Sequence, residues 1–93
     1  MLRILGYDYT VDTSKVQRDM DACGRADFCL QVISVANDLS DDQMRSTMLH
    51  EIIEVLDYSL DLQLDHGKIC QLEAGLYAVL KTNGVDLGPL LDR

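Results

Sequence analysis

The stretch TMLHEIIEVLDYSL, residues 47–60, predicts the longest helix of this chain. Its apolar side chains recur every three or four residues, which is the pattern of the buried face of an amphipathic helix. Just before it, Ser40 is followed three residues later by Gln43, as in a capping box that satisfies free N–H groups at a helix start. We therefore expect a helix over about residues 41–60.

A second helix follows after a short turn. Asp65 is a candidate N-cap, and Asn83-Gly84 is a strong stop signal, because both residue types tolerate the backbone conformation that ends helices. This predicts a helix over about residues 66–82, antiparallel to the first because the connecting turn is short. Residues 85–93 contain Gly-Pro and are expected to form an irregular tail, whose leucines either fold back on the core or contact a partner.

The N-terminal half predicts a small sheet. Residues 2–11, with a bend at Gly6, and residues 26–36, rich in β-branched and apolar side chains, have the composition of strands. Residues 12–25 are polar and are expected to form a connection with one short helical turn. Since no full crossover helix is evident, we expect antiparallel pairing. The predicted fold is α+β, a single domain over residues 1–84 in which a small antiparallel sheet packs on two helices.

The charge of the chain restricts its partners. Sixteen acidic and eight basic residues give a net charge of −8 over 93 residues, which argues against a grip on nucleic-acid phosphates or on an anionic membrane surface. Basic proteins, peptides and metal cations remain. No run approaches the about 20 apolar residues of a membrane span. Three cysteines, none in C-x-x-C, predict reduced thiols in the cytoplasm, best interpreted as buried apolar side chains: Cys23, Cys29 and Cys70.

The letters HEIIE, residues 50–54, place His50 and Glu54 one turn apart on the same side of the first helix. Two such side chains can share a metal ion. The pattern differs from the zinc signature H-E-x-x-H only at its last position. Taken alone, this helix also fits a simpler interpretation, a solvent-exposed face, because its apolar residues lie on the opposite side.

Glu73 changes that balance, because it lies within the apolar stripe of the second helix. A carboxylate in such a position is costly unless it is paired or bound to a metal ion. The preceding helix offers His50 and Glu54 as partners. A place at the rim of the stripe, with access to water or an ion pair to Arg45 or Arg25, is the alternative.

The candidate ligands are imidazole and carboxylate groups on the two helices: His50, Glu54 and Glu73. Glu51 is rotated from His50 along the helix and takes the place of the general base in the H-E-x-x-H arrangement. One imidazole and two carboxylates form a hard donor set that binds zinc less strongly than two imidazoles and also accepts manganese or iron. Weaker candidates are His66 as a ligand and Asp57 as a hydrogen-bond partner of the imidazole.

The stretch STMLHEIIEVLDYSLDLQLDHGKICQLEAGLYAVLKTNG, residues 46–84, resembles the helical half of small zincin-like proteins encoded by phages and prophages. The segment RADFCLQVISVAND fits their preceding strand, and the resemblance extends over residues 1–84. It implies a minimal zincin, in which a small sheet is followed by an active-site helix and by a helix that supplies a glutamate. His50 then matches the first ligand, Glu51 the general base, and Glu54 and Glu73 the second and third ligand positions.

The resemblance implies one of two functions. The first is a metal-dependent peptidase, in which an extended peptide adds as a strand beside residues 28–36. The second is a non-catalytic interaction protein that retains the fold with an empty or purely structural metal site. Glu54 stands where the peptidase signature has histidine, so the resemblance indicates the fold more strongly than the chemistry. An exposed edge strand and the leucine-rich tail are also compatible with a homodimer.

Overall fold

The two long helices begin and end where the sequence predicts. In the computed structural model, which describes residues 1–92, α2 spans Asp41–Leu60 and α3 spans His66–Thr82. The side chains of Ser40 and Asp65 each accept a hydrogen bond from the backbone N–H three residues further on, at 3.1 and 2.8 Å. These caps satisfy donors that the first turn of a helix leaves free, which fixes both helix starts.

The sheet is mixed, with the strand order β1-β2-β4-β3. β1 (Leu2–Ile4) and β2 (Tyr7–Asp12) form one antiparallel hairpin, β3 (Gly24–Asp27) and β4 (Val32–Val35) form another, and β2 pairs with β4 in parallel. The prediction of a purely antiparallel sheet was therefore wrong. The chain between β2 and β4 includes the expected helical turn, α1 (Gln17–Met20), together with β3, and this is long enough to return it to the same end of the sheet.

Residues 2–11, predicted as one bent strand, are a tight hairpin. Leu5 and Gly6 have φ angles of 52° and 85°. Positive φ at both central positions is the requirement of the two-residue turns whose twist matches paired strands. The bend expected at Gly6 is thus a full reversal of the chain.

Residues 26–36, predicted as one continuous strand, are also interrupted. The Asp27 carboxylate accepts hydrogen bonds from the backbone N–H groups of Cys29 and Leu30, at 3.0 and 2.9 Å, and Gln31 has a φ of 57°. The Asp27 side chain thus replaces the neighbouring strand as hydrogen-bond partner of these N–H groups, and the chain turns. Residue composition does not reveal such a turn. As a consequence, β4 lies inside the sheet, and the edge strand on this side is β3 rather than residues 28–36.

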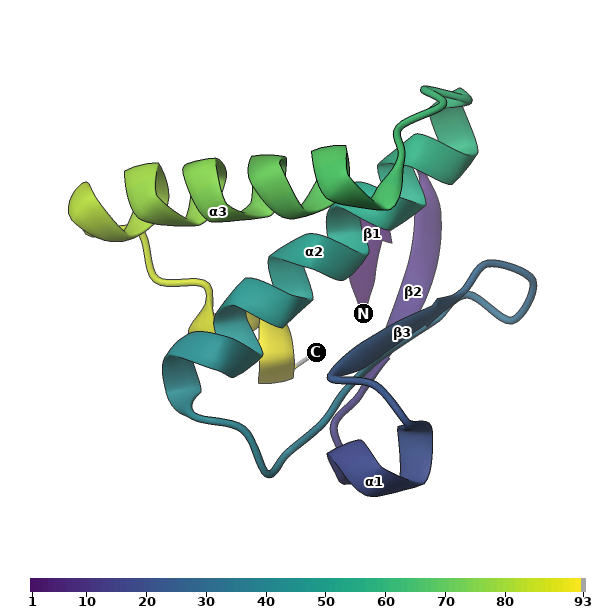
Figure 1. Ribbon diagram of the computed structural model, residues 1–93. Helices are drawn as coiled ribbons and strands as arrows, with labels where there is room; N and C mark the ends of the chain where they lie inside the picture. Colours follow the sequence, from purple (N-terminus) through teal and green to yellow (C-terminus); the bar gives the residue numbers. More distant parts are fainter. Residues whose placement is uncertain (93) are drawn as a thin grey trace.

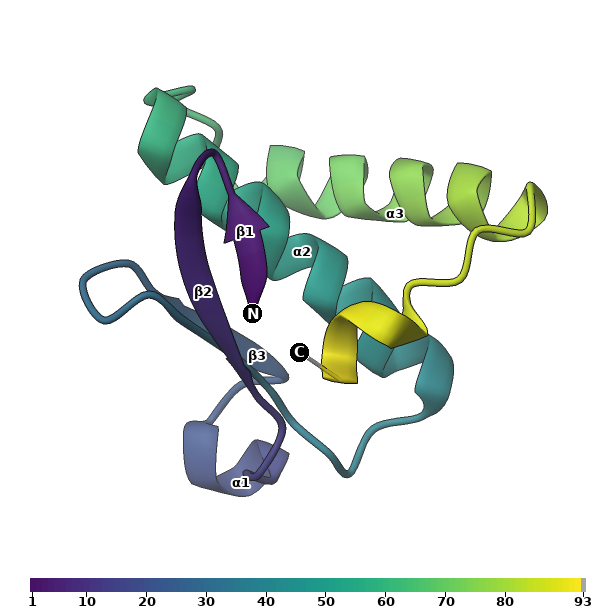
Figure 2. The same ribbon diagram turned by 180° about the vertical axis from the view of Figure 1, so that it is seen from behind.

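The core lies between α2 and the sheet. β1, β3 and β4, as well as α3 and the C-terminal segment, all pack against α2. Figure 1 shows α3 lying across α2, and Figure 2 shows the β1–β2 hairpin and the C-terminal turn on the other side of that helix. The main buried cluster is apolar and comes from β1, β2, β4 and α2: Ile4, Tyr9, Ile33, Val35, Met48 and Val55.

The tail is more regular than expected. Gly88–Asp92 form a 3-10 helix, η1, that packs against α2. Leu87 is buried, and Leu90 and Leu91 pack against the core, so the leucines fold back. Over residues 1–92, no helix is long and apolar enough to cross a membrane.

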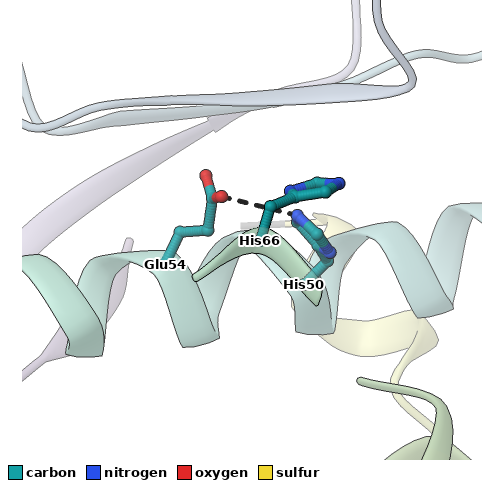
Figure 3. Close-up of side chains that lie close together, drawn as sticks. All are labelled: His50, Glu54 and His66. Atoms are coloured by element: carbon teal, nitrogen blue, oxygen red, sulfur yellow. Dashed lines mark ion pairs between the residues drawn. The ribbon is translucent and has the colours of Figure 1, made fainter. Parts of the chain in front are cut away.

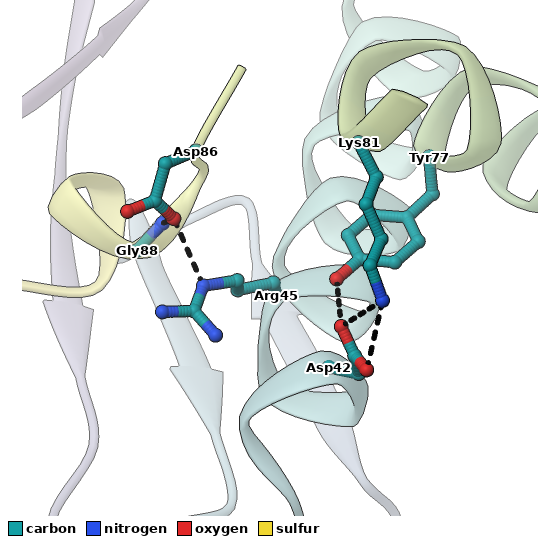
Figure 4. A network of polar contacts seen from close by, with 6 residues as sticks. All are labelled: Asp42, Arg45, Tyr77, Lys81, Asp86 and Gly88. Carbon is teal, nitrogen blue, oxygen red and sulfur yellow. Dashed lines mark hydrogen bonds and ion pairs between the residues drawn. The ribbon is translucent and has the colours of Figure 1, made fainter. Parts of the chain in front are cut away.

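Polar contacts join the N-terminal end of α2 to the C-terminal end of α3 (Figure 4). The Asp42 carboxylate, in the first turn of α2, accepts hydrogen bonds from Tyr77 Oη at 2.7 Å and from Lys81 Nζ at 2.9 Å. The start of α2 therefore lies beside the end of α3, and the predicted antiparallel arrangement is confirmed. Nearby, Arg45 Nε donates to Asp86 at 3.0 Å and holds the start of the tail.

Candidate metal centre

His50 has a carboxylate at each of its two ring nitrogens. Nδ1 lies 2.8 Å from Glu73 Oε1. Nε2 lies 3.5 Å from Glu54 Oε1, and Figure 3 shows this second contact. The side chains of His50 and Glu73 are only 14% and 17% exposed. The structure thus brings the three sequence-predicted ligands together, but it places Glu54 and Glu73 on opposite sides of one imidazole.

The environment of Glu73 explains how a carboxylate is accommodated in an apolar stripe. One oxygen contacts His50, and the other accepts a hydrogen bond from Ser46 on the same helix as that histidine. Both oxygens are therefore satisfied, as buried polar groups require. Arg45 and Arg25, the alternative partners, make other contacts.

A neutral His50 ring has too few protons for the two carboxylates beside it. A neutral imidazole has one N–H and one lone pair, and an ionised carboxylate only accepts hydrogen bonds. Two carboxylates at one neutral ring therefore leave one contact without a proton. Either the ring or one of the carboxyl groups carries a second proton, or a cation lies at one nitrogen. The shorter contact to Glu73, itself held by Ser46, favours Nδ1 as the protonated nitrogen and leaves the lone pair of Nε2 for a cation.

His66 completes a cluster on the Nε2 side. It is the first residue of α3, and its ring meets that of His50 edge-on, with centroids 5.4 Å apart (Figure 3). One ligand atom each from His50, Glu54 and His66 lie within 4.8 Å of one another. Ligand bonds of about 2.0–2.1 Å in a tetrahedral site separate neighbouring ligand atoms by about 3.3 Å. The 3.5 Å between His50 and Glu54 is already close to that spacing.

A second cluster lies on the Nδ1 side and consists of His50, Cys70 and Glu73. Cys70 Sγ also contacts His66 Nε2 at 3.4 Å. Cys70 and Cys29 are exposed, so the interpretation of the cysteines as buried apolar side chains was wrong for these two. Cys70 follows His66 by four residues and precedes Glu73 by three, a spacing that places all three on one helical face and could have predicted this cluster.

Glu51 is the most deeply buried carboxylate near this cluster, with 4% of its surface exposed. Its Oε1 has no hydrogen-bond partner among the described residues. Burial is the main cause that raises the pKa of Glu51 to about 7, and repulsion from the neighbouring Glu54 carboxylate is the second. At neutral pH this group therefore exists in both protonation states, which is the condition for exchanging a proton with a reacting molecule.

Gly24 allows β3 to approach α2 at this point. A Cβ atom there would lie 2.5 Å from Thr47 Cγ2 and 3.0 Å from Glu51 Oε2. Only glycine permits so close an approach. Gly24 and the two residues before it line one side of a cavity of about 320 Å³. The cavity is lined by the start of β3 and by polar side chains of α2 and α3, including His50, Glu51 and Glu73.

Asp57 has a different role from the one considered for it. Its Oδ1 accepts a hydrogen bond from the backbone N–H of Leu64, at 2.9 Å, and so holds the turn between α2 and α3. The structure shows no contact between Asp57 and His50 in the part of the chain it describes.

Comparison with known proteins gave no match: no family model fits the chain, and neither a curated protein nor a solved structure is similar to it. The resemblance to zincin-like phage proteins thus stays a prediction.

Proposed function

We propose that this protein binds one divalent transition-metal ion, with zinc as the leading candidate, through His50 Nε2, Glu54 and His66. The observation that carries the proposal is the position of His50 between two carboxylates, where a neutral ring has only one proton to offer. A cation at Nε2 removes this mismatch. It also attracts Glu54 and His66, which already lie beside that nitrogen.

The donor set suits zinc better than the one expected from the sequence. Two imidazoles and one carboxylate are the ligands of one type of catalytic zinc site, in which water fills the fourth position. Glu73 is then an orienting residue rather than a ligand, because it accepts the Nδ1–H of His50. Metal-bound histidines commonly have such a carboxylate partner, which fixes the ring and increases its basicity.

Glu51 supports a second step of the proposal, in which the centre hydrolyses peptide bonds as the zincin-like resemblance implies. A metal ion in such a site supplies a water molecule that is acidic enough to react near neutral pH. Glu51 provides a carboxylate with an unpartnered oxygen and a pKa of about 7, suited to accept a proton from water and pass it to a leaving amine. Gly24 holds it beneath the edge strand, along which an extended peptide can lie.

Metal analysis tests the first step. We expect about one zinc ion per chain after dialysis of zinc-loaded protein, and loss of that ion in His50→Ala, Glu54→Gln and His66→Ala. Glu73→Gln should keep the ion with affinity reduced about 10- to 100-fold, as for other orienting partners. Cys70→Ser is the control and should bind zinc like the wild type. Zinc loss in Cys70→Ser but not in His66→Ala would assign the ion to the Nδ1 cluster instead.

A protein that binds no divalent metal, with melting unchanged by chelator, would contradict the proposal. For hydrolysis, Glu51→Gln should retain zinc and lose turnover of a mixed peptide library. Zinc-loaded wild type without turnover would support the interaction-protein alternative.

A further inference from the structure

A second cavity, of about 740 Å³, lies at the C-terminal end of α2 and shares no lining residue with the metal centre. Aromatic and polar side chains both line it. Four of the five aromatic residues of the chain line it: Tyr7, Tyr9, Phe28 and Tyr58. The rings of Phe28 and Tyr58 are stacked, with centroids 4.2 Å apart and planes 1° from parallel. This stack joins the β3–β4 loop to α2.

The same cavity is acidic. Asp57 and Asp61 line it, and none of its described lining residues is basic. Aromatic faces attract cations through their quadrupole, and carboxylates attract them by charge. The aromatic rings and the carboxylates that line the cavity thus favour the same kind of ligand, an organic cation with an apolar stem.

The cavity is preformed by its loops. The carbonyl group of Gln31 accepts a hydrogen bond from the backbone N–H of Thr10, at 2.9 Å, which ties the β3–β4 loop to β2. On the opposite side, Asp57 holds the backbone of Leu64 at 2.9 Å. The loops that bear the aromatic and acidic groups are therefore fixed before any ligand arrives.

We propose that this aromatic cavity binds the cationic head of an arginine or lysine side chain in an extended peptide. The assignment of that peptide as a substrate rests on the function proposed above, whereas its binding does not require the metal ion. Charge complementarity argues for this occupant, since the lining offers two carboxylates and the protein has a net charge of −8.

The position of the cavity along β3 argues for a peptide. β3 begins at Gly24, beside Glu51, and is followed directly by Phe28 in the cavity wall. Four residues of strand span about 13 Å, the length of a short extended segment. On α2, Tyr58 follows Glu54 by one turn, about 6 Å. β3 is an edge strand, so a peptide laid along it passes from the metal centre to the cavity.

Titration of metal-free protein with acetyl-Ala-Ala-Arg-Ala-Ala-amide tests the proposal, in the presence of chelator and at physiological salt. Phe28 is the only phenylalanine, so the ring signals of protein labelled at phenylalanine report on the cavity alone. We expect saturable shifts of these signals. The peptide with citrulline, which has the same shape without the charge, should bind about tenfold more weakly. Equal binding of the two peptides, or no shift at Phe28, would overturn the proposal.

A matched pair of variants separates the cavity from general attraction to an acidic protein. Asp61 and Asp21 are both exposed helix C-caps with left-handed φ angles of 51° and 54°, and asparagine tolerates that conformation. Asp61→Asn should weaken binding about two- to fivefold, whereas Asp21→Asn should leave it unchanged. Equal effects of the two variants would contradict a local site.

Tyr58→Phe and Tyr58→Leu test the aromatic wall. The phenylalanine variant keeps the π face and should bind like the wild type, while the leucine variant should bind about two- to fivefold more weakly. Acetyl-arginine amide, which lacks the flanking peptide, should bind more weakly than the full peptide. Equal affinity would show a site for a small free cation and overturn the peptide assignment. Because every titration uses metal-free protein, the absence of zinc binding at His50 would refute the proposed function without affecting this result.

Discussion

Gly24 in β3 lies so close to Glu51 in α2 that a Cβ atom on the glycine would be 3.0 Å from the Glu51 carboxylate. The edge strand β3 and helix α2 therefore meet at a point where neither has room for another atom. This contact encloses the carboxylate, and it links the packing of the fold to the electrostatics of the candidate site.

Gly24→Ala should destabilise the protein by about 1–3 kcal/mol, the usual cost of overpacking, because the new methyl group overlaps Thr47 Cγ2. Urea denaturation measures the change. Adding Thr47→Ser, which removes Cγ2, should recover part of the loss. Gly75→Ala is the matched control: this helical glycine has nothing within 4 Å of the added atom, so the substitution should stabilise α3 by about 0.5–1 kcal/mol. Destabilisation of similar size at both sites would contradict the assigned contact.

Glu51→Gln should stabilise the chelator-treated protein increasingly as the pH rises. The folded-state pKa of about 7 lies above the ordinary value of 4.5, so folding favours the protonated acid and is opposed by its ionisation. The penalty is absent below about pH 4.5, grows up to about pH 7 and then stays constant at up to about 3 kcal/mol. Urea denaturation of both proteins at about pH 5 and pH 8 measures it. A difference in stability that does not change with pH would show that Glu51 titrates normally.

Asp42→Asn should weaken the attachment of α3 at neutral pH and have little effect in strong acid. A hydrogen bond from Lys81 and, with a smaller effect, one from Tyr77 hold the pKa of Asp42 below its ordinary value. Asp42 therefore contributes its full stabilisation when the pH is above the ordinary pKa of aspartate. This stabilisation is lost as the pH falls through the lowered pKa of the folded protein. Thermal melting at about pH 7 and pH 2 tests this. Asp41→Asn, one residue earlier in the same helical turn, is the control for a general charge effect.

Zinc should raise the thermal stability of the protein, and chelator should reverse the effect. A ligand at 100 times its dissociation constant adds about 2.7 kcal/mol to the free energy of unfolding. Imidazole binds a metal ion only when unprotonated, so the stabilisation should shrink in acid. Calorimetry of wild type and His66→Ala, with and without zinc, measures both effects. Equal stabilisation of the two proteins would exclude His66 as a ligand.

The helices and the His50–Glu73 contact could be predicted from the sequence because each depends on local patterns. Capping residues determined the bounds of α2 and α3, and the helical period placed Glu73 among apolar residues facing the preceding helix. The two hairpins were missed, because the reversal at Leu5 has one glycine and the turn after Asp27 depends on a side-chain hydrogen bond. Periodicity cannot reveal such contacts.

The arrangement of the site could be predicted only in part. Spacing places His50, Glu54 and Glu73 near one another, but which ring nitrogen meets which carboxylate depends on side-chain rotation and on the helix crossing. His66 lies at a helix start, where the direction of its ring follows from the turn before it. The mixed sheet was likewise a matter of tertiary pairing, since β2 and β4 are joined in parallel by residues far apart in sequence.

α3 buries only Ile69, and its attachment to α2 relies on polar groups in its middle, at Glu73, and near its C-terminal end, at Lys81. Amide hydrogens in this helix should therefore exchange with solvent by local opening more readily than those of α2, whose side chains fill the core. The proposed metal ion, bound by His50 and His66, would join the first turn of α3 to α2. Binding of the ion should then slow the exchange of amide hydrogens along the whole of α3, including residues far from the metal centre.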